Sequence, residues 1–340
     1  MSMSIQQALE QVLAGHDLTS EQMQSAMNII MQGEATSAQI AGFIVALRMK
    51  GESVDELAAA ARVMRSLSSK VEINAQPLID TCGTGGDGQK TFNISTASSI
   101  VAASAGVKIA KHGNRSVSSK SGSADVLEAL GVKLEITPQK IAQCVEQIGI
   151  GFMFAPMHHS CMKYAIGARK ELGVRTLFNL LGPLTNPANA SRQVLGVFDD
   201  QWLQPLARVL QSLGTEHALV VHAQDGLDEI SIASATNICE LRDGEVSSYQ
   251  VTPADCGLKS SSLDTIKVNN VTDSANMITA VLNGESSPAA DIVCLNAGAA
   301  IYVAGKTGTL KNGVQLAAEQ LSSKAAQNKL AQLVEFTNKS

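Results

Sequence analysis

Residues 80–88 read Asp-Thr-Cys-Gly-Thr-Gly-Gly-Asp-Gly and place four glycines within the six positions from 83 to 88. Glycine at this density costs conformational entropy and buries no side chain, so it is kept where the backbone turns tightly or a ligand approaches closely. The apolar run Pro77-Leu78-Ile79 precedes the segment, and residues 93–99 lead into an expected helix. A glycine loop between a strand and a helix start predicts an anion site, with phosphate as the first candidate ligand.

Two familiar nucleotide motifs resemble this loop without fitting it. Gly83-x-Gly85-x-x-Gly88 has the dinucleotide spacing, but residues 107–111 read Val-Lys-Ile-Ala-Lys and lack the acid expected about 20 residues on. The Walker spacing is also present, but Gln89 stands between the last glycine and Lys90-Thr91, which moves the lysine off a phosphate cradle. Both motifs bind phosphate groups, so the loop is still expected to bind an anion. The alternative is a structural turn without a ligand.

A second polar segment covers residues 111–123, after an expected strand and before an expected helix. It reads Lys-His-Gly-Asn-Arg-Ser-Val-Ser-Ser-Lys-Ser-Gly-Ser, with three cations and five hydroxyls. Loops at the carboxyl ends of parallel strands carry ligands in α/β folds, so this loop and the glycine loop could converge. Lysine, arginine and hydroxyl donors suit a polyanionic ligand, and a solvated basic loop is the alternative.

An acidic motif, Asp225-Gly226-Leu227-Asp228-Glu229-Ile230, follows the apolar run at residues 218–221. Adjacent carboxylates repel each other, so such a pair after a buried strand suggests a nearby cation. Oxygen ligands favour Mg²⁺, which commonly bridges carboxylates and substrate phosphates. Ordinary surface acids are the alternative.

The composition excludes several classes of protein. The 340-residue chain has a formal net charge of -5 and 3% aromatic residues, which argues against a nucleic-acid-binding face. Six scattered cysteines form no CxxC pair, so we expect free thiols and a cytoplasmic protein. The first residues lack a signal pattern, and no apolar run approaches the roughly 20 residues of a membrane span.

Residues 1–69 are predicted to form a small helical domain, because no strand pattern interrupts them. Three capping boxes, Thr19-x-x-Gln22, Thr36-x-x-Gln39 and Ser53-x-x-Glu56, each precede a helical apolar stripe. Gly33 and Gly51 are expected to end the preceding helices. The broad apolar faces could pack on the chain's own body or on a second subunit.

From residue 70 onward, short apolar runs alternate with helical patterns, which predicts an α/β domain with a mostly parallel central sheet. The expected strands are Leu78-Ile79 and residues 107–110, 151–154, 194–198 and 218–221, and the expected helices include 123–130 and 138–147. Asp243-Gly244 predicts a hairpin over 237–251. Two helices, near 287–304 and 312–335, are expected to close the chain.

The motifs together are more specific than any one of them. Beside the three segments above, the chain carries Asn93-Ile94-Ser95-Thr96, Arg169-Lys170-Glu171-Leu172-Gly173 and Arg175-Thr176-x-Phe178-Asn179-x-Leu181-Gly182-Pro183-Leu184-x-Asn186-Pro187. In this order, over nearly the whole chain, the sequence resembles the anthranilate phosphoribosyltransferase family. The resemblance implies a helical domain at 1–69, joined by a segment near 160–184, and an α/β domain at 70–340. Gly167 departs from the family pattern, which often has proline there.

The resemblance also implies an activity, transfer of phosphoribose from phosphoribosyl diphosphate to anthranilate in tryptophan biosynthesis, by homodimers formed through the helical domain. It implies two Mg²⁺ per subunit, held by Ser95, Asp228 and Glu229, and anthranilate contacts from Gly83, Asn114 and Arg169. Phosphoribosyl diphosphate is then expected at Gly83, Gly86, Asp87, Thr91, Asn93, Ile94, Ser95, Thr96, Lys111, His112, Gly113, Asn114, Arg115, Ser116, Val117, Ser118, Ser119 and Ser123. Lys111 is expected to stabilise charge, and no residue is expected to act as an acid or base.

Three other functions stay open on the sequence. A pyrimidine nucleoside phosphorylase would use free phosphate without the Asp228-Glu229 pair, and a non-catalytic relative could bind nucleic acid. A transferase could also use a substituted aromatic acid. His112 is a candidate contact for anthranilate, and His158 and His159 are expected to shape the entrance.

Overall fold

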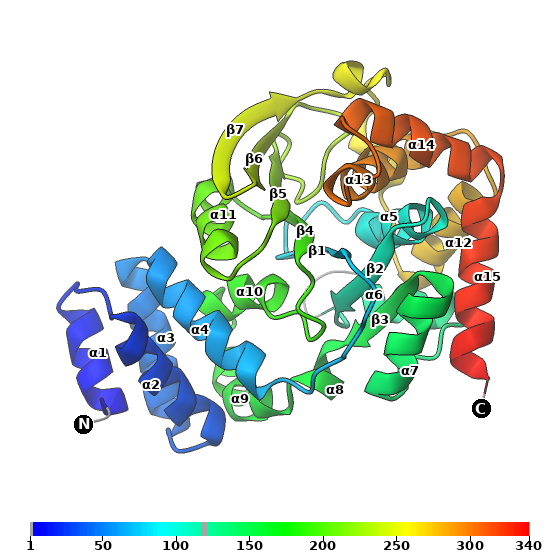
Figure 1. Ribbon diagram of the computed structural model, residues 1–340. Coiled ribbons are helices and arrows are strands. Elements are labelled where there is room, and N and C mark those ends of the chain that lie inside the picture. Colours follow the sequence, from blue (N-terminus) through cyan, green and yellow to red (C-terminus); the bar gives the residue numbers. More distant parts are fainter. Residues whose placement is uncertain (1–2, 117–120, 340) are drawn as a thin grey trace.

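The computed structural model describes residues 3–116 and 121–339 and shows a bundle of helices beside an α/β body (Figure 1). The bundle contains α1 (Ile5–Leu13), α2 (Ser20–Gln32), α3 (Ser37–Lys50) and α4 (Val54–Leu67). The three predicted capping boxes are confirmed at α2, α3 and α4. Gly33 and Gly51 are the C-caps of α2 and α3, as predicted.

A later segment of the chain packs against this bundle. Helix α9 (Lys163–Leu172) contacts α2 and α3, and α10 (Leu177–Leu181) contacts α3 and α4. Ala165, Ala168 and Leu177 share one apolar core with residues of α1 to α4. The segment that carries Arg169 is therefore held by the helical bundle.

The body is built on one seven-stranded sheet with the order β3-β2-β1-β4-β5-β6-β7. The four pairings from β3 to β5 are parallel, and the last two pairings, β5–β6 and β6–β7, are antiparallel, so the predicted fold class is confirmed. The strands are β1 (Leu78–Gly83), β2 (Lys108–Gly113), β3 (Ile150–Phe154), β4 (Arg192–Gly196), β5 (His217–Ala223), β6 (Thr236–Arg242) and β7 (Glu245–Val251). The β6–β7 hairpin turns at Asp243 and Gly244, whose φ angles of 52° and 80° suit a primed turn.

Helices cover both faces of the sheet (Figure 1). One face packs on α5 (Ile94–Ser104) and α13 (Pro288–Val303), against which α14 (Leu310–Ser322) and α15 (Ala325–Asn338) lie. The other face packs on α11 (Leu203–Ser212), α10 and the bundle. The remaining helices are α6 (Ser123–Ala129), α7 (Pro138–Gln143), α8 (Ala155–His158) and α12 (Val271–Leu282). Within the described residues, no helix is long and apolar enough to cross a membrane.

Two predicted helices differ from the structure. The single helix expected near 312–335 is wrong, because Lys324 adopts a left-handed φ of 60° and divides it into α14 and α15. This break lets α15 turn back and contact α5, which the helical periodicity of the sequence does not reveal. The helix expected at 138–147 is α-helical only over α7 and continues as a π-turn, Cys144–Ile148, that ends at Gly149.

Candidate functional site

The glycine loop and the acidic pair, 140 or so positions apart in the chain, meet at the carboxyl ends of β1 and β5. The backbone N–H of Gly85 donates to Asp228 Oδ2 at 2.9 Å. The N–H of Ser95, in the first turn of α5, donates to Glu229 Oε1 at 3.1 Å. The convergence arises because β4 alone separates β1 from β5 in the parallel part of the sheet.

Glycine is required at two positions so that Asp228 can approach this closely. A Cβ on Gly83 would lie 2.6 Å from Asp228 Oδ2, and one on Gly196 would lie 1.6 Å from the Asp228 carbonyl oxygen. The first glycine belongs to the predicted loop. The second lies at the end of β4 and was not among the predicted site residues.

The two acids carry strongly perturbed pKa values. Burial, followed by repulsion from Asp87, raises the pKa of Asp228 to about 7. Burial, followed by repulsion from Asp228, raises the pKa of Glu229 to about 8. Both side chains keep some surface open to solvent, but the dense protein around them makes their charge costly. A divalent cation would offset the energetic cost of burying the two carboxylate charges and would reduce their mutual repulsion, so the pair fits Mg²⁺.

The described residues alone do not complete a metal site. No group of three or more His, Cys, Asp or Glu side chains in this part of the chain could hold a metal ion. Asp228 and Glu229, with the neighbouring Ser95 hydroxyl, would therefore need oxygen atoms from a bound ligand to fill the coordination shell.

Lys111 is buried beside β1, the strand that leads into the glycine loop. Its ammonium group donates to the Thr81 carbonyl and lies 3.4 Å from Ser95 Oγ, and the residue is 3% exposed. Burial lowers the pKa of Lys111, while the nearby charges of Asp80 and Glu229 oppose this shift. Lys111 thus brings positive charge to the base of the site.

A buried polar network supports the ends of β1 and β2. Asp80 accepts from the backbone N–H of His112 at 3.1 Å and from Asn186 Nδ2 at 2.7 Å. Asn186 also donates to the Ala110 carbonyl at 2.8 Å. Burial raises the pKa of Asp80, and the charge of Lys111 together with these two hydrogen bonds opposes the shift. The network fixes the two strands from which both loops start.

The described residues of the basic segment follow β2, which neighbours β1 in the sheet, and the arginine among them is already paired. Arg115 forms ion pairs with Glu128 and, at 3.1 Å, with Asp125, and it lies over the Phe154 ring. Ser116 N donates to Asp125 Oδ2, and Ser123 Oγ donates to the Asn114 carbonyl. Gly113 makes room for Ser123, whose Oγ would lie 2.2 Å from an added Cβ. The predicted residues Val117, Ser118 and Ser119 lie outside the described residues.

Four further predicted residues lie just before α5 or in its first turn, and their surroundings differ. The side chain of Asn93 forms hydrogen bonds within the protein: its Oδ1 accepts from Ser121 Oγ and from Ser274 Oγ, each at 2.7 Å. Thr91 makes a β-bridge with Lys267, and Ile94 is buried. Thr96 Oγ1 is buried and has no hydrogen-bond partner among the described residues. The N-terminal turn of α5 still offers positive potential to an anion.

Arg169 and two histidines, His158 and His159, lie on the segments that follow β3, and a third histidine, His112, lies near the end of β2. Arg169 lies over the Phe178 ring at 5.2 Å, and no ion pair in the described part of the chain involves it. His112 and His159 meet edge to face at 5.1 Å. Burial, followed by their mutual charges, lowers the pKa of His112 to about 3, and burial lowers that of His159 to about 4. His158 is tied to the Ser69 carbonyl through Nδ1 at 2.8 Å.

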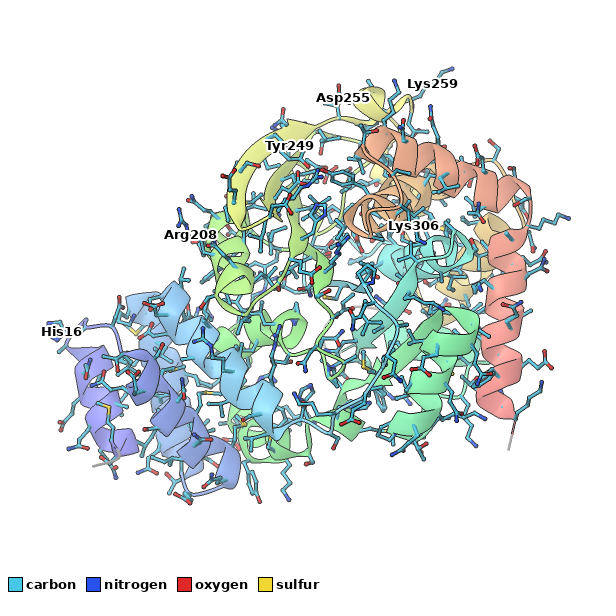
Figure 2. All side chains as sticks on the ribbon, viewed as in Figure 1. His16, Arg208, Tyr249, Asp255, Lys259 and Lys306 are labelled. Atoms are coloured by element: carbon cyan, nitrogen blue, oxygen red, sulfur yellow. The ribbon has the colours of Figure 1, made fainter. Side chains whose placement is uncertain are left out.

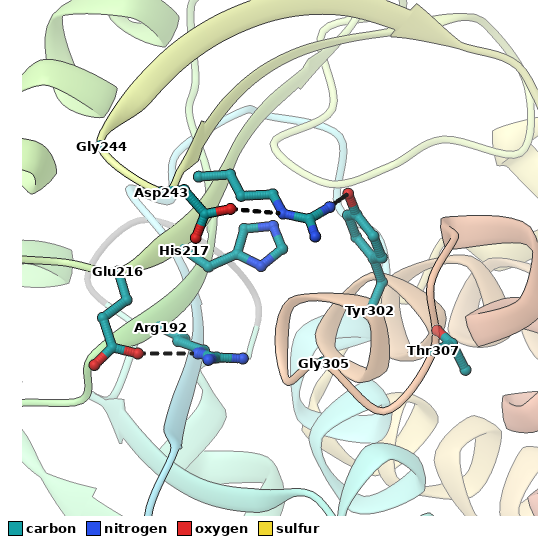
Figure 3. Close-up of a pocket in the computed structure, with 9 residues that line it drawn as sticks. Arg192, Glu216, His217, Asp243, Gly244, Tyr302, Gly305 and Thr307 are labelled. Carbon is teal, nitrogen blue, oxygen red and sulfur yellow. Dashed lines mark hydrogen bonds and ion pairs between the residues drawn. The ribbon is translucent and has the colours of Figure 1, made fainter.

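Another cavity, of about 500 Å³, lies at the opposite end of the parallel strands, where β4 and β5 begin (Figure 3). Arg192 and His217 line it from the first residues of β4 and β5. Its polar groups have partners within the protein: Arg192 pairs with Glu216 at 3.3 Å (Figure 3). His217 Nε2 and Tyr302 Oη each lie 2.8 Å from Oε1 of Glu240, which is not itself part of the lining. The carboxyl ends of the strands, where the predicted residues meet, are therefore a separate site.

Charged side chains of both signs project from the outside of the body. Figure 2 shows Arg208 on α11, Lys306 after α13, and both Asp255 and Lys259 beyond β7.

Several residues of the site were missed on the sequence. Thr84, Arg175 and Phe198 contact the glycine loop or belong to it, and none was assigned a role. Arg175 is the first residue of the 175–187 motif in the sequence, but only the fold shows that its side chain contacts the glycine loop.

Comparisons with known proteins agree over nearly the whole chain. Residues 75–327 match the family described as "Glycosyl transferase family, a/b domain", and residues 6–68 match its helical bundle domain. Anthranilate phosphoribosyltransferase of Thioalkalivibrio sulfidiphilus is 58% identical over 98% of this chain and 99% of its own. The crystal structure of the Thermus thermophilus enzyme has 44% identity and a TM-score of 0.93, covering 98% and 99% of the two chains. The Saccharomyces cerevisiae enzyme, solved in complex with PRPP and Mg, has 26% identity and a TM-score of 0.89 over 98% and 97%.

Proposed function

The chain belongs to the anthranilate phosphoribosyltransferase family, and we propose that its reaction takes place where the glycine loop meets Asp228 and Glu229. The enzyme is a glycosyltransferase of tryptophan biosynthesis. It transfers phosphoribose from phosphoribosyl diphosphate (PRPP) to the amine of anthranilate and releases diphosphate. The convergence of the loop with the acidic pair is the observation that carries this assignment.

The glycine loop would hold the diphosphate. Its bare N–H groups, the N-terminal turn of α5 and the buried charge of Lys111 all provide positive potential at one place. Gly83, Gly86 and Thr91 fit this role, whereas Asp87 more reasonably faces ribose or metal-bound water, since its charge repels phosphate. Asn93, the N-cap of α5, would act by fixing the start of that helix to Ser121 and Ser274.

Asp228 and Glu229, with Ser95, would hold two Mg²⁺ per subunit. The yeast relative was solved with PRPP and Mg, and we extend that pairing to this chain. When bound, the metal neutralises the charge that grows on the departing diphosphate. The chain's own part is to keep both carboxylates beside the loop, through the N–H groups of Gly85 and Ser95.

Arg169 would recognise the carboxylate of anthranilate, with Asn114 adding a neutral hydrogen bond. A guanidinium without an acidic partner in the described residues remains available for a planar carboxylate. His112 and His159, held neutral, would line the space for the aromatic ring. The aromatic amine is uncharged at pH 7, so catalysis needs no base and depends on positioning and charge stabilisation.

The helical part would form a homodimer. Large apolar side chains are exposed on it and on the segment packed against it: Leu13 (68%), Met49 (84%), Tyr164 (41%) and Ile166 (48%). Light scattering at micromolar concentration tests this, and a monomer mass would refute it.

We also propose the domain boundaries 1–69 and 70–340. We propose a cytoplasmic location as well, because all six cysteines are free thiols.

Loss of anthranilate fluorescence tests the proposed reaction. We expect consumption only when PRPP, Mg²⁺ and the enzyme are all present. Inorganic phosphate with a pyrimidine nucleoside serves as the second arm. Nucleoside cleavage without any loss of anthranilate would establish the phosphorylase instead.

A further inference from the structure

Arg175 is a charged residue of the site that the reaction scheme above leaves without a role. It lies between α9 and α10, directly before Thr176, the N-cap of α10. Its guanidinium donates through Nη2 to the carbonyl of Gly86 in the glycine loop. The same group lies over the Phe198 ring, 3.9 Å from its centroid.

With Arg175 in this position, little room is left for a side chain at Gly86. A Cβ on Gly86 would lie 2.8 Å from Arg175 Nη2, and Gly86 has a left-handed φ of 77°. The arginine therefore packs directly against bare backbone. Its charge also favours the ionised form of the neighbouring Asp87 carboxyl, although burial raises the pKa of Asp87 overall.

Holding one carbonyl orients a whole peptide unit. The unit is planar and trans, so its C=O and N–H point in opposite directions. With the Gly86 carbonyl bound to Arg175, the N–H of Asp87 must point away from this arginine. Thr84, two residues earlier, is fixed similarly, since Phe198 N donates to Thr84 Oγ1 at 3.0 Å and Thr84 N donates to the Gly196 carbonyl at 2.9 Å.

Arg175 also joins this loop to the helical bundle. Arg48, in the last turn of α3, donates through Nη1 to the Arg175 carbonyl at 2.7 Å. One residue thus contacts α3 through its main chain and the glycine loop through its side chain.

We propose that Arg175 is a positioning residue that sets the backbone of the glycine loop for magnesium diphosphate. This inference rests on the proposed function and assigns a determinant of affinity for the phosphoribosyl donor. Arg175 acts through the Gly86 peptide, whereas Arg169 would contact anthranilate itself.

Calorimetric titration of magnesium diphosphate into the full-length protein tests the proposal. Arg175→Ala should weaken binding about tenfold, in line with the loss of a charge-assisted hydrogen bond. Arg175→Lys should recover only part of this affinity, because lysine keeps the charge and loses the planar stack on Phe198. Arg62→Ala is the matched control: Arg62 also joins the bundle to the body, through Ser212, but does not contact the loop.

Steady-state kinetics separates positioning from a general structural effect. Arg175→Ala should raise the KM for PRPP about tenfold and leave the KM for anthranilate within about twofold. Wild-type affinity for magnesium diphosphate in Arg175→Ala, or an equal rise in both KM values, would overturn the inference. If the wild-type protein neither binds magnesium diphosphate nor consumes anthranilate, the proposed function fails instead.

Discussion

Arg169 carries the residue-scale prediction for substrate recognition. Arg169→Ala should raise the KM for anthranilate about tenfold to hundredfold, because a charge-assisted hydrogen bond contributes roughly 1.5–3 kcal/mol. The KM for PRPP should change little. Initial rates over a matrix of both substrates measure the two constants, and a rise confined to PRPP would refute the assignment.

Gly83 tests the close approach of the loop to the acidic pair. Gly83→Ala should lower kcat/KM strongly, since its Cβ would lie 2.6 Å from Asp228 Oδ2. Gly182→Ala is the control within the same fold, because an added Cβ there meets nothing within 4 Å. Comparable kcat/KM values for Gly83→Ala and the wild-type protein would show that Asp228 need not sit against the loop.

At the scale of elements, the sequence predicted most boundaries for local reasons. Capping boxes mark α2, α3 and α4, and Asp243-Gly244 marks the β6–β7 turn, because these signals reside in neighbouring residues. The break at Lys324 was not predictable in this way: a lysine in the left-handed region follows from the packing of α15 on α5.

The same limit applies to the site. The glycine loop and the acidic pair were identified by composition and spacing, and the fold brings them into contact. Arg115 is predicted to contact the ligand, and that stays a prediction; its ion pairs with Glu128 and Asp125 depend on α6, which the sequence motif alone does not reveal. Gly196 and Arg175 were missed because their roles depend on contacts between distant segments.

Gly167 carries the prediction for an element. It lies inside α9, and an added Cβ would meet nothing within 4 Å. Gly167→Ala should therefore raise the free energy of unfolding by about 0.5–1 kcal/mol. Urea denaturation measures the change. Gly173→Ala is the control with the opposite sign, because Gly173 has a left-handed φ of 60°. A destabilising Gly167→Ala would show that α9 needs glycine there.

At the scale of the whole molecule, two buried histidines should make stability fall in acid. A histidine in the unfolded chain has a pKa near 6.5, whereas burial lowers the pKa of His112 to about 3 and that of His159 to about 4. The unfolded state therefore takes up more protons as the pH falls below 6.5. Each histidine should cost up to about 1.4 kcal/mol of stability per pH unit in that range.

Unfolding free energies between pH 7.5 and 5 measure this dependence. The double variant His112→Gln with His159→Gln should show a smaller loss of stability than the wild-type protein over this interval. His16→Gln, which replaces an exposed histidine, is the control and should follow the wild-type curve. Parallel curves for the double variant and the wild-type protein would contradict the assignment of these two groups.

The acidic pair tests the central claim, that metal-bound diphosphate leaves from the glycine loop. The measurement is the rate of anthranilate consumption by Asp228→Asn with Glu229→Gln at saturating Mg²⁺ and PRPP. Asp243→Asn, an exposed acid on the β6–β7 turn, is the control. The double variant removes two repelling charges, so its thermal stability should not fall. We predict that it loses most activity, by roughly a hundredfold or more, while the control keeps wild-type turnover. Near-normal turnover by a folded double variant would contradict this account.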